Sequence, residues 1–169
     1  MSNKIEIGYP NINHNYDDKK IKELNNAVKQ GKKVFLFVFW DMCGPCQQTI
    51  PKWNDINVNN NDNNIIALVN KEYFDKLENM GEQPYGFPTL RYIEKTPSSI
   101  IIEKYENANF DGDKDRSTES FHKWINHHNH KHLNGGKINR KSRKYKPRKH
   151  RKSRKTKKLE NLKKIKTKK

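Results

Sequence analysis

Cysteine is scarce in this 169-residue chain: it occurs twice, as Cys43 and Cys46. Two cysteines in one short segment cannot form the disulfide framework of a small secreted domain. The first residues lack the apolar stretch of a signal peptide, and no run approaches the roughly 18 apolar residues of a membrane span. The sequence therefore predicts a protein that is not secreted by the usual route, has no transmembrane segment and is cytoplasmic or nuclear.

Acidic residues are almost absent from the C-terminal part of the chain. Residues 137–169 contain 19 Lys and Arg residues and one acid, a net charge of +18, whereas residues 1–136 have a net charge of −1. With 31% hydrophobic and 33% charged residues, the chain is too polar for one core throughout. We expect an N-terminal segment at 1–15, a folded domain at 16–132 and a disordered Lys/Arg-rich tail at 133–169.

Apolar periodicity predicts alternating helices and strands. The expected helices are residues 17–30, 46–57, 71–80 and a last one that starts near 117; the expected strands are 34–40, 65–69, 89–93 and 100–105, with a further short strand at 4–7. The last two strands are close enough in sequence to pair as an antiparallel hairpin. This order predicts a mixed sheet with helices on both faces, a three-layer α/β/α sandwich.

The two cysteines form the motif Cys43-Gly44-Pro45-Cys46, directly after an apolar strand. At the first turn of a helix, unpaired N–H groups and the helix dipole favour negative charge, so we expect Cys43 to react as the thiolate. A second cysteine three positions later, Cys46, can close a disulfide bridge with it. A dithiol redox site is therefore the leading interpretation.

Two other interpretations of the cysteine pair remain open. Such a pair can be half of a zinc site, although the chain has no second pair. It can also be a remnant in a domain that no longer turns over. His128 and His132 have the spacing of two ligands on one helix face, but cations near a helix C-terminus are also favoured by the dipole. We predict no metal site and no cofactor beyond a Cys43–Cys46 disulfide.

Residues 34–124 resemble a thioredoxin-like domain of the thioredoxin and protein disulfide isomerase type. The resemblance depends on four features: the strand that ends in Phe39-Trp40, the CGPC motif at 43–46, Pro51 five residues after Cys46, and Gly86-Phe87-Pro88-Thr89 before the next strand. It implies a thioredoxin-like fold and a thiol–disulfide oxidoreductase, with Cys43 attacking and Cys46 resolving. It also implies protein disulfide substrates and a thiol electron donor, and we expect a monomer.

The same resemblance implies which residues bind substrate and where this chain departs from the family. The implied substrate-binding residues are Trp40, Met42, Gly44, Pro45, Phe87 and Pro88. Pro88 would follow a cis bond, with the backbone of Phe87 docking the substrate, and the Gly-Pro pair implies a reducing poise like that of thioredoxin. Phe37 replaces the usual buried acid that helps to deprotonate the second thiol, and Met42 replaces the usual Trp before the first cysteine.

The basic tail predicts binding to polyanions. The expected contacts are Arg148, Lys149, Arg151, Lys152, Arg154 and Lys155, which would bind phosphates through counterion release with little sequence reading. Nucleic acid, an anionic membrane surface and an import receptor are all possible partners, as is a merely solubilising role. The alternative function is thus a non-catalytic thioredoxin-like binding or virion-associated protein whose tail binds nucleic acid.

Composition adds one further resemblance. The Asn-, Ile- and Lys-rich sequence and the Gly135-Gly136 pair before the basic tail resemble proteins encoded by large AT-rich DNA viruses. That resemblance implies an oxidoreductase packaged in a virion and held near the genome by its tail.

Overall fold

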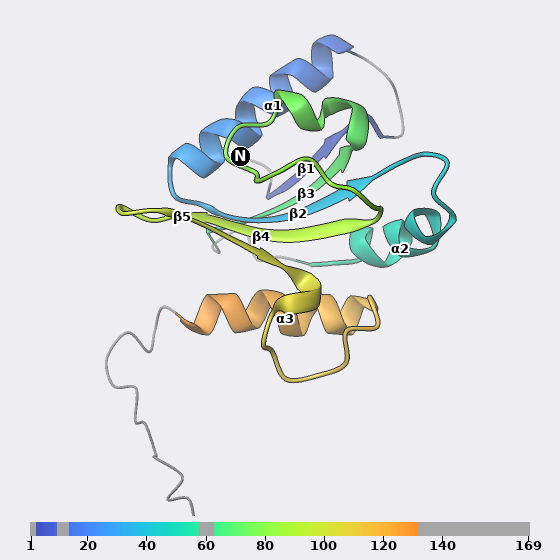
Figure 1. Cartoon of the computed structure of the whole chain (residues 1–169), viewed down its shortest axis with the longest axis vertical. Coiled ribbons are helices and arrows are strands. Elements are labelled where there is room, and N and C mark those ends of the chain that lie inside the picture. Colours follow the sequence, from blue (N-terminus) through green and yellow to red (C-terminus); the bar gives the residue numbers. More distant parts are fainter. Residues whose placement is uncertain (1–2, 10–13, 58–62, 132–169) are drawn as a thin grey trace, which may run out of the picture. The chain divides into compact units, whose positions relative to one another are not determined.

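A five-stranded mixed sheet forms the centre of the domain (Figure 1). The structure is a computed structural model that describes residues 3–9, 14–57 and 63–131. The strands lie in the order β1 (Lys4–Ile7), β3 (Asn64–Asn70), β2 (Lys33–Phe39), β4 (Thr89–Lys95) and β5 (Ile100–Lys104). β1, β3 and β2 are parallel, and β4 and β5 continue the sheet as an antiparallel pair. The short first strand and the predicted hairpin are both present.

The central strand β2 is apolar without interruption because both of its faces are buried. Phe35, Phe37 and Phe39 belong to the core on one face of the sheet, whereas Val34, Leu36 and Val38 belong to the core on the other face. The period of two along the strand thus separates aromatic from aliphatic side chains.

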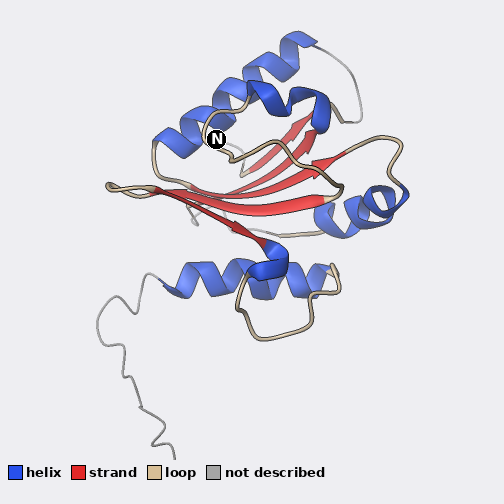
Figure 2. Ribbon diagram, viewed as in Figure 1, coloured by secondary structure: helices blue, strands red, loops and turns tan. Residues whose placement is uncertain are grey.

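Helices cover both faces of the sheet (Figure 2). One face packs against α1 (His14–Lys29) and the 3-10 helix η1 (Lys71–Lys76), and the other against α2 (Gly44–Asn54) and α3 (Thr118–Lys131). A further 3-10 turn, η2 (Tyr105–Asn107), leads from β5 toward α3. The predicted three-layer α/β/α thioredoxin-like fold is confirmed.

Three predicted helices differ from the observed ones, and the first, α1, begins at His14 rather than at residue 17. The helix expected at 71–80 is a 3-10 helix that ends at Lys76, because Leu77 adopts an extended conformation and Asn79 and Gly81 have positive φ angles. α2 begins at Gly44 rather than at Cys46, because Cys43 itself caps the helix. The predicted boundary at residue 133 and the basic tail lie outside the described residues.

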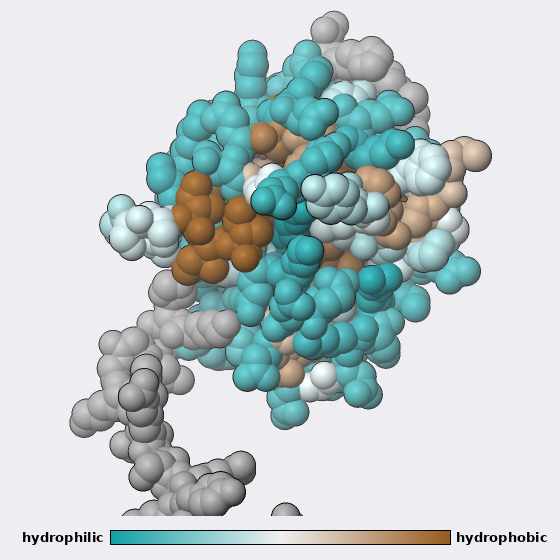
Figure 3. Space-filling view, viewed as in Figure 1, coloured by the Kyte–Doolittle hydropathy of each residue, from teal (hydrophilic) through white to brown (hydrophobic). Residues whose placement is uncertain are grey.

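The outer strand β5 exposes three consecutive isoleucines, Ile100, Ile101 and Ile102, each about 40% exposed. Figure 3 shows a hydrophobic patch over this strand. No helix in the described part of the chain is long and apolar enough to cross a membrane.

Candidate active site

The CGPC motif lies where β2 ends and α2 begins. β2 ends at Phe39, and the Cys43 N–H donates to the carbonyl of Trp40 at 3.0 Å, which closes a tight turn before the helix. Cys43 is the N-cap of α2, so its side chain lies beside the unpaired N–H groups of the first helical turn. The sheet therefore delivers Cys43 to the positive end of the α2 dipole.

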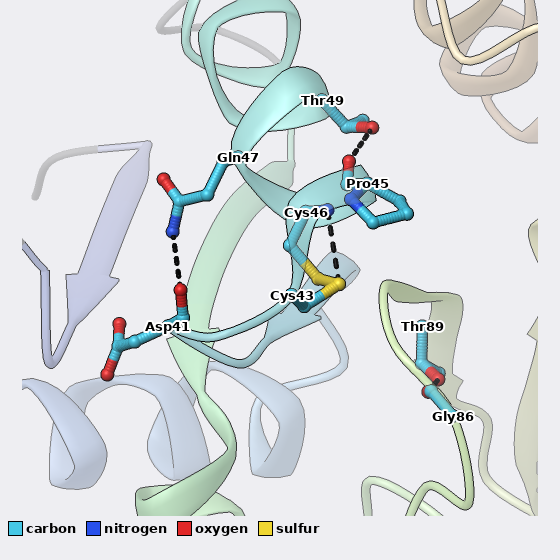
Figure 4. Close-up of a disulfide and its surroundings, with 8 residues drawn as sticks. All are labelled: Asp41, Cys43, Pro45, Cys46, Gln47, Thr49, Gly86 and Thr89. Atoms are coloured by element: carbon cyan, nitrogen blue, oxygen red, sulfur yellow. Dashed lines mark hydrogen bonds between the residues drawn. A yellow bond between two sulfur atoms is a disulfide. The ribbon is translucent and has the colours of Figure 1, made fainter.

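Cys43 and Cys46 form a disulfide, with Cα atoms 5.2 Å apart (Figure 4). The backbone N–H of Cys46 donates to Cys43 Sγ at 3.2 Å, in the manner of an N-cap hydrogen bond. Pro45 has no N–H, so the first turn has one unpaired backbone donor fewer than with any other residue at this position. In the reduced protein the same Cys46 N–H would favour negative charge on Cys43 Sγ.

The two sulfurs differ in access to solvent. Cys43 is 9% exposed and Cys46 is fully buried in the aromatic core beneath α2. A Cβ atom at Gly44 would meet nothing within 4 Å, so the surface beside Cys43 is open to a large partner. This order of burial suits Cys43 as the sulfur that attacks an external disulfide and Cys46 as the sulfur that attacks internally.

Hydrogen bonds hold the loop before Cys43 in place from two sides. The Asn70 side chain, buried at the end of β3, donates to Asp41 Oδ2 at 2.9 Å and accepts from the Glu72 N–H at 3.1 Å. From α2, Gln47 Nε2 donates to the Asp41 carbonyl at 3.2 Å (Figure 4). Sequence reasoning missed this network; its signal was an asparagine that ends an otherwise apolar strand.

The segment that contains Phe87 and Pro88 lies at the same end of the sheet as the disulfide. Thr89 begins β4 and pairs with Val38, one residue before the end of β2. Phe87 packs against the core cluster that contains both cysteines, and Pro88 is buried and follows a cis peptide bond. The Thr89 hydroxyl donates to the Gly86 carbonyl at 2.6 Å, and Figure 4 shows these two residues across from the disulfide.

Two large apolar side chains are exposed just before the first cysteine. Met42 is 78% exposed, and Trp40 is 39% exposed, with the Lys71 ammonium 4.3 Å from its ring centroid. Pro45 is also exposed. The structure thus brings all the predicted substrate-binding residues to one end of the domain, and it adds Lys71, which the sequence did not indicate.

Phe37 occupies the interior of the core below the disulfide. It is fully buried and its ring centroid lies 5.4 Å from that of Trp53 on α2. Among the described residues the buried carboxylates are Asp17 and Glu94, and both have other partners: Asp17 accepts from the Gly8 N–H, and Glu94 accepts from the Tyr92 hydroxyl.

A buried polar cluster lies at the opposite end of β4 from the disulfide. The Tyr92 hydroxyl donates to Glu94 Oε2 at 2.5 Å, and the Tyr92 ring stacks on His128 with centroids 3.7 Å apart. His128 Nε2 also lies 3.3 Å from Glu103 Oε2. Burial, and then the hydrogen bond to Glu94, raise the pKa of Tyr92. His128 is buried against Phe35 and Trp124 and therefore lies on the inward face of α3.

No cluster of three or more His, Cys, Asp or Glu residues within 3–9, 14–57 and 63–131 could hold a metal ion. His132 and the six predicted anion-binding residues of the tail lie outside those ranges.

Strand order and helix placement define a thioredoxin-like fold, with a Cys43–Cys46 disulfide at the start of α2. No family model matches the chain, and no curated protein does. The solved structures that are similar to it at low identity include the following three.

The J-Trx1 fragment of ERdj5 aligns at 20% identity and a TM-score of 0.48 over 75% of this chain and 51% of that chain. The Trx4 domain of ERdj5 aligns at 14% identity and a TM-score of 0.45, over 78% of this chain and 99% of that chain. Zinc-bound human ERp44 aligns at 14% identity and a TM-score of 0.43, over 73% of this chain and 30% of that chain. The chain thus spans about half of the first of these structures and under a third of the last. At these TM-scores the fold assignment depends on the topology of the sheet and its helices alone.

Proposed function

We propose that this protein is a thiol–disulfide oxidoreductase that works through Cys43 and Cys46. The observation that carries the proposal is the disulfide at the N-terminus of α2, with the more accessible sulfur at the N-cap and the other buried one turn further on. A low-energy thiolate, an open approach and an internal resolving thiol are the requirements of dithiol exchange.

The reaction balances as a two-electron transfer. In the reduced protein the Cys43 thiolate attacks one sulfur of a substrate disulfide, a mixed disulfide forms, and the other substrate sulfur leaves with the bonding electron pair and takes a proton. Cys46 then loses its proton and attacks Cys43 Sγ, which releases the second substrate thiolate and leaves the Cys43–Cys46 disulfide seen here. An external thiol donor must return two electrons before the next cycle.

The buried Phe37 and Trp53 around Cys46 offer no carboxylate to accept its proton, so water or the departing substrate thiolate serves as the base. Gly44 and Pro45 between the cysteines match the pair in thioredoxin, and this resemblance implies reduction of substrates rather than their oxidation. A reduction potential near thioredoxin's, about −270 mV, would agree with this direction, whereas one near about −180 mV would indicate an oxidant or isomerase.

Protein disulfides are the proposed substrates. Trp40, Met42 and Pro45 present exposed apolar surface beside Cys43, and the backbone of Phe87 would dock an extended substrate segment across from it. An extended peptide there would gain main-chain hydrogen bonds and position its own sulfur over Cys43.

The test is reduction of insulin disulfides with dithiothreitol as electron donor. The wild-type protein should accelerate reduction, Cys43→Ser should abolish it, and Cys46→Ser should accumulate a mixed disulfide with substrate that reducing agent releases. Cys43 and Cys46 are the only cysteines in the chain, so a trapped adduct in Cys46→Ser reports on Cys43 alone. A folded, reduced wild-type protein with no activity above the dithiothreitol background would refute the proposal.

A second candidate function is binding of nucleic acid or another polyanion through residues 137–169. The observation that favours it is charge segregation, +18 in this segment against −1 in the rest of the chain. This binding would be salt-dependent and largely independent of sequence. It is compatible with the redox activity, since it would localise the domain rather than change its chemistry.

A further inference from the structure

A cavity of about 740 Å³ lies beside the Phe87–Pro88 segment, and its lining residues do not include Cys43 or Cys46. Residues 81–89 form one wall, and the other wall comes from Arg91, β5 and the η2 turn. Because Pro88 and Thr89 line it, the cavity begins at the segment proposed to dock substrate and extends from there toward the edge of the sheet.

The wall formed by residues 81–89 is fixed at both ends. At one end the buried Arg91 donates from Nη1 to the Met80 carbonyl at 2.7 Å. Next to it, Gly81 has a φ of +88°, and a Cβ there would lie 3.0 Å from Arg91 Nη1, so glycine lets the chain pass this close. At the other end Thr89 bonds to the Gly86 carbonyl. Hydrogen bonds at both ends therefore hold residues 81–89, which form this wall of the cavity, in place.

Tyr85 stands in the middle of this wall and is 99% exposed. A tyrosine with its whole ring in water contributes almost nothing to folding, because the free-energy gain of an aromatic side chain comes from burial. Phe87, two residues on, packs into both cores, so the segment projects one aromatic inward and leaves the other free to contact a partner. Ile102 of β5 also lines the cavity, and it is one of the three exposed isoleucines of that strand, over which a hydrophobic patch lies (Figure 3).

We propose that this cavity is a substrate subsite that receives an apolar side chain of a polypeptide disulfide, with Tyr85 as its specificity-determining residue. The inference rests on the proposed function, since the peptide that fills the cavity is the one whose sulfur reacts with Cys43. An extended peptide along Phe87–Pro88 continues into the cavity, because Pro88 belongs to both. Successive side chains of an extended peptide point to opposite sides, so one side chain enters the cavity while those of its two neighbours remain in solvent.

Charge at the rim argues against an acidic side chain as the occupant. Glu82, Glu103 and Glu106 line the cavity, against the cations Arg91 and Lys104. Arg91 is buried and bonded to the Met80 carbonyl, so it does not face the occupant as a surface cation. Glu106 pairs with Arg116 and Glu103 lies against His128, so Glu82 and Lys104 remain and the rim offers an acidic side chain no excess of accessible cations. Tyr85 and Ile102 offer apolar contacts from opposite walls.

The test compares peptide disulfides that differ at one position. A single Phe is placed two to five residues from the cysteine, on either side, in an otherwise Ala and Gly peptide, and Ala and Glu versions are made of each. With the wild-type protein, Phe at one of these positions should lower KM about three- to tenfold relative to Ala, with kcat unchanged, and Glu should raise KM. Tyr85→Ala should abolish the preference for Phe.

Two controls separate the subsite from the chemistry. Oxidised glutathione has no apolar side chain to place in the cavity, so wild type and Tyr85→Ala should reduce it at equal rates. Tyr16→Ala removes another exposed tyrosine, on α1, and should keep the preference. Normal glutathione turnover with no Phe preference, or a preference that persists in Tyr85→Ala, overturns the subsite alone. Failure of the wild type on both peptide and glutathione overturns the proposed function and the subsite together.

Discussion

At the scale of single residues, the core below the disulfide is aromatic where thioredoxins usually have an acid. Phe37 packs on Trp53, which in turn contacts Phe121 and Trp124 at centroid distances of 5.0 and 6.5 Å. A carboxylate in the place of Phe37 would be desolvated among these rings at high cost. The aromatic packing therefore explains why the core accommodates Phe37 better than an acid. Phe37 contributes to the stability of the fold and has no group that could transfer a proton.

Phe37→Ala should lower the free energy of unfolding by about 3–5 kcal/mol, because it opens a cavity between β2 and α2. Urea denaturation followed by tryptophan fluorescence measures the change. Tyr16→Ala, at an exposed ring on α1, is the control and should stay within about 0.5 kcal/mol of wild type. A loss below about 1 kcal/mol in Phe37→Ala would contradict the packing described here.

The raised pKa of Tyr92 predicts that the free energy of unfolding falls at alkaline pH. Burial and the Glu94 bond raise the pKa of folded Tyr92 above the value of about 10 in the unfolded chain. Below about pH 10 the hydroxyl is neutral in both states. Above it the unfolded tyrosine ionises while the folded one keeps its proton, so Tyr92 should cost up to about 1.4 kcal/mol of stability per pH unit.

The measurement is urea denaturation between pH 9 and 11 on wild type and Tyr92→Phe. Tyr92→Phe should be less stable at neutral pH, because buried Glu94 loses its donor, but its stability should fall less steeply with pH. Tyr73 and Tyr105, whose pKa values burial also raises, contribute equally to both proteins. Identical slopes would show that Tyr92 ionises in the folded state as readily as in the unfolded one.

At the scale of elements, the α2 start depends on contacts that no local sequence pattern encodes. The loop before Cys43 is tied to the end of β3 by Asn70 and to α2 by Gln47, so the position of Cys43 is set jointly by these two elements. Helix periodicity placed the start of α2 at Cys46, because it cannot see that a cysteine side chain acts as the cap. It also extended the helix expected at 71–80 past the actual end of η1, since apolar spacing continues to Leu77 and Met80 without helical hydrogen bonds.

Asn70→Ala should cost about 1–3 kcal/mol, because it leaves the Glu72 N–H and Asp41 without their partner. It should also speed amide hydrogen exchange in the loop that leads to Cys43. Asn63→Ala is the matched control, since Asn63 is exposed and its side chain donates a long hydrogen bond of 3.4 Å to the Gly31 carbonyl. Unchanged exchange at residues 41–43 would show that the loop is held by its own turn and not by β3.

At the scale of the whole molecule, the excess of positive charge and the described fold belong to different parts of the chain. The structure describes residues within 3–131, whose sheet includes β1 from the predicted N-terminal segment. The domain boundary near 133, the disordered state of the tail, the monomeric state and the viral and virion resemblance stay predictions. So do the cytoplasmic or nuclear location and the six anion-binding residues of the tail.

Truncation to residues 1–136 separates the two proposed activities. It removes a net charge of +18, so binding to a DNA duplex or to heparin at low salt should be lost, whereas disulfide reduction should be retained. For the full-length protein, the logarithm of the apparent binding constant should fall linearly with the logarithm of the salt concentration. Equal retention of DNA by both proteins would exclude the tail as the anion-binding segment.

The sequence by itself determined the alternation of strands and helices, the cysteine pair at a strand-to-helix junction and the separation of charge, because each is encoded by local periodicity or composition. Only the tertiary structure decided which sulfur is accessible, how Asn70 and Asp41 hold the loop, and that Tyr85 and Ile102 face one cavity. These facts depend on contacts between residues far apart in the chain, and such contacts exist only once the sheet has brought β3, β4 and β5 beside β2.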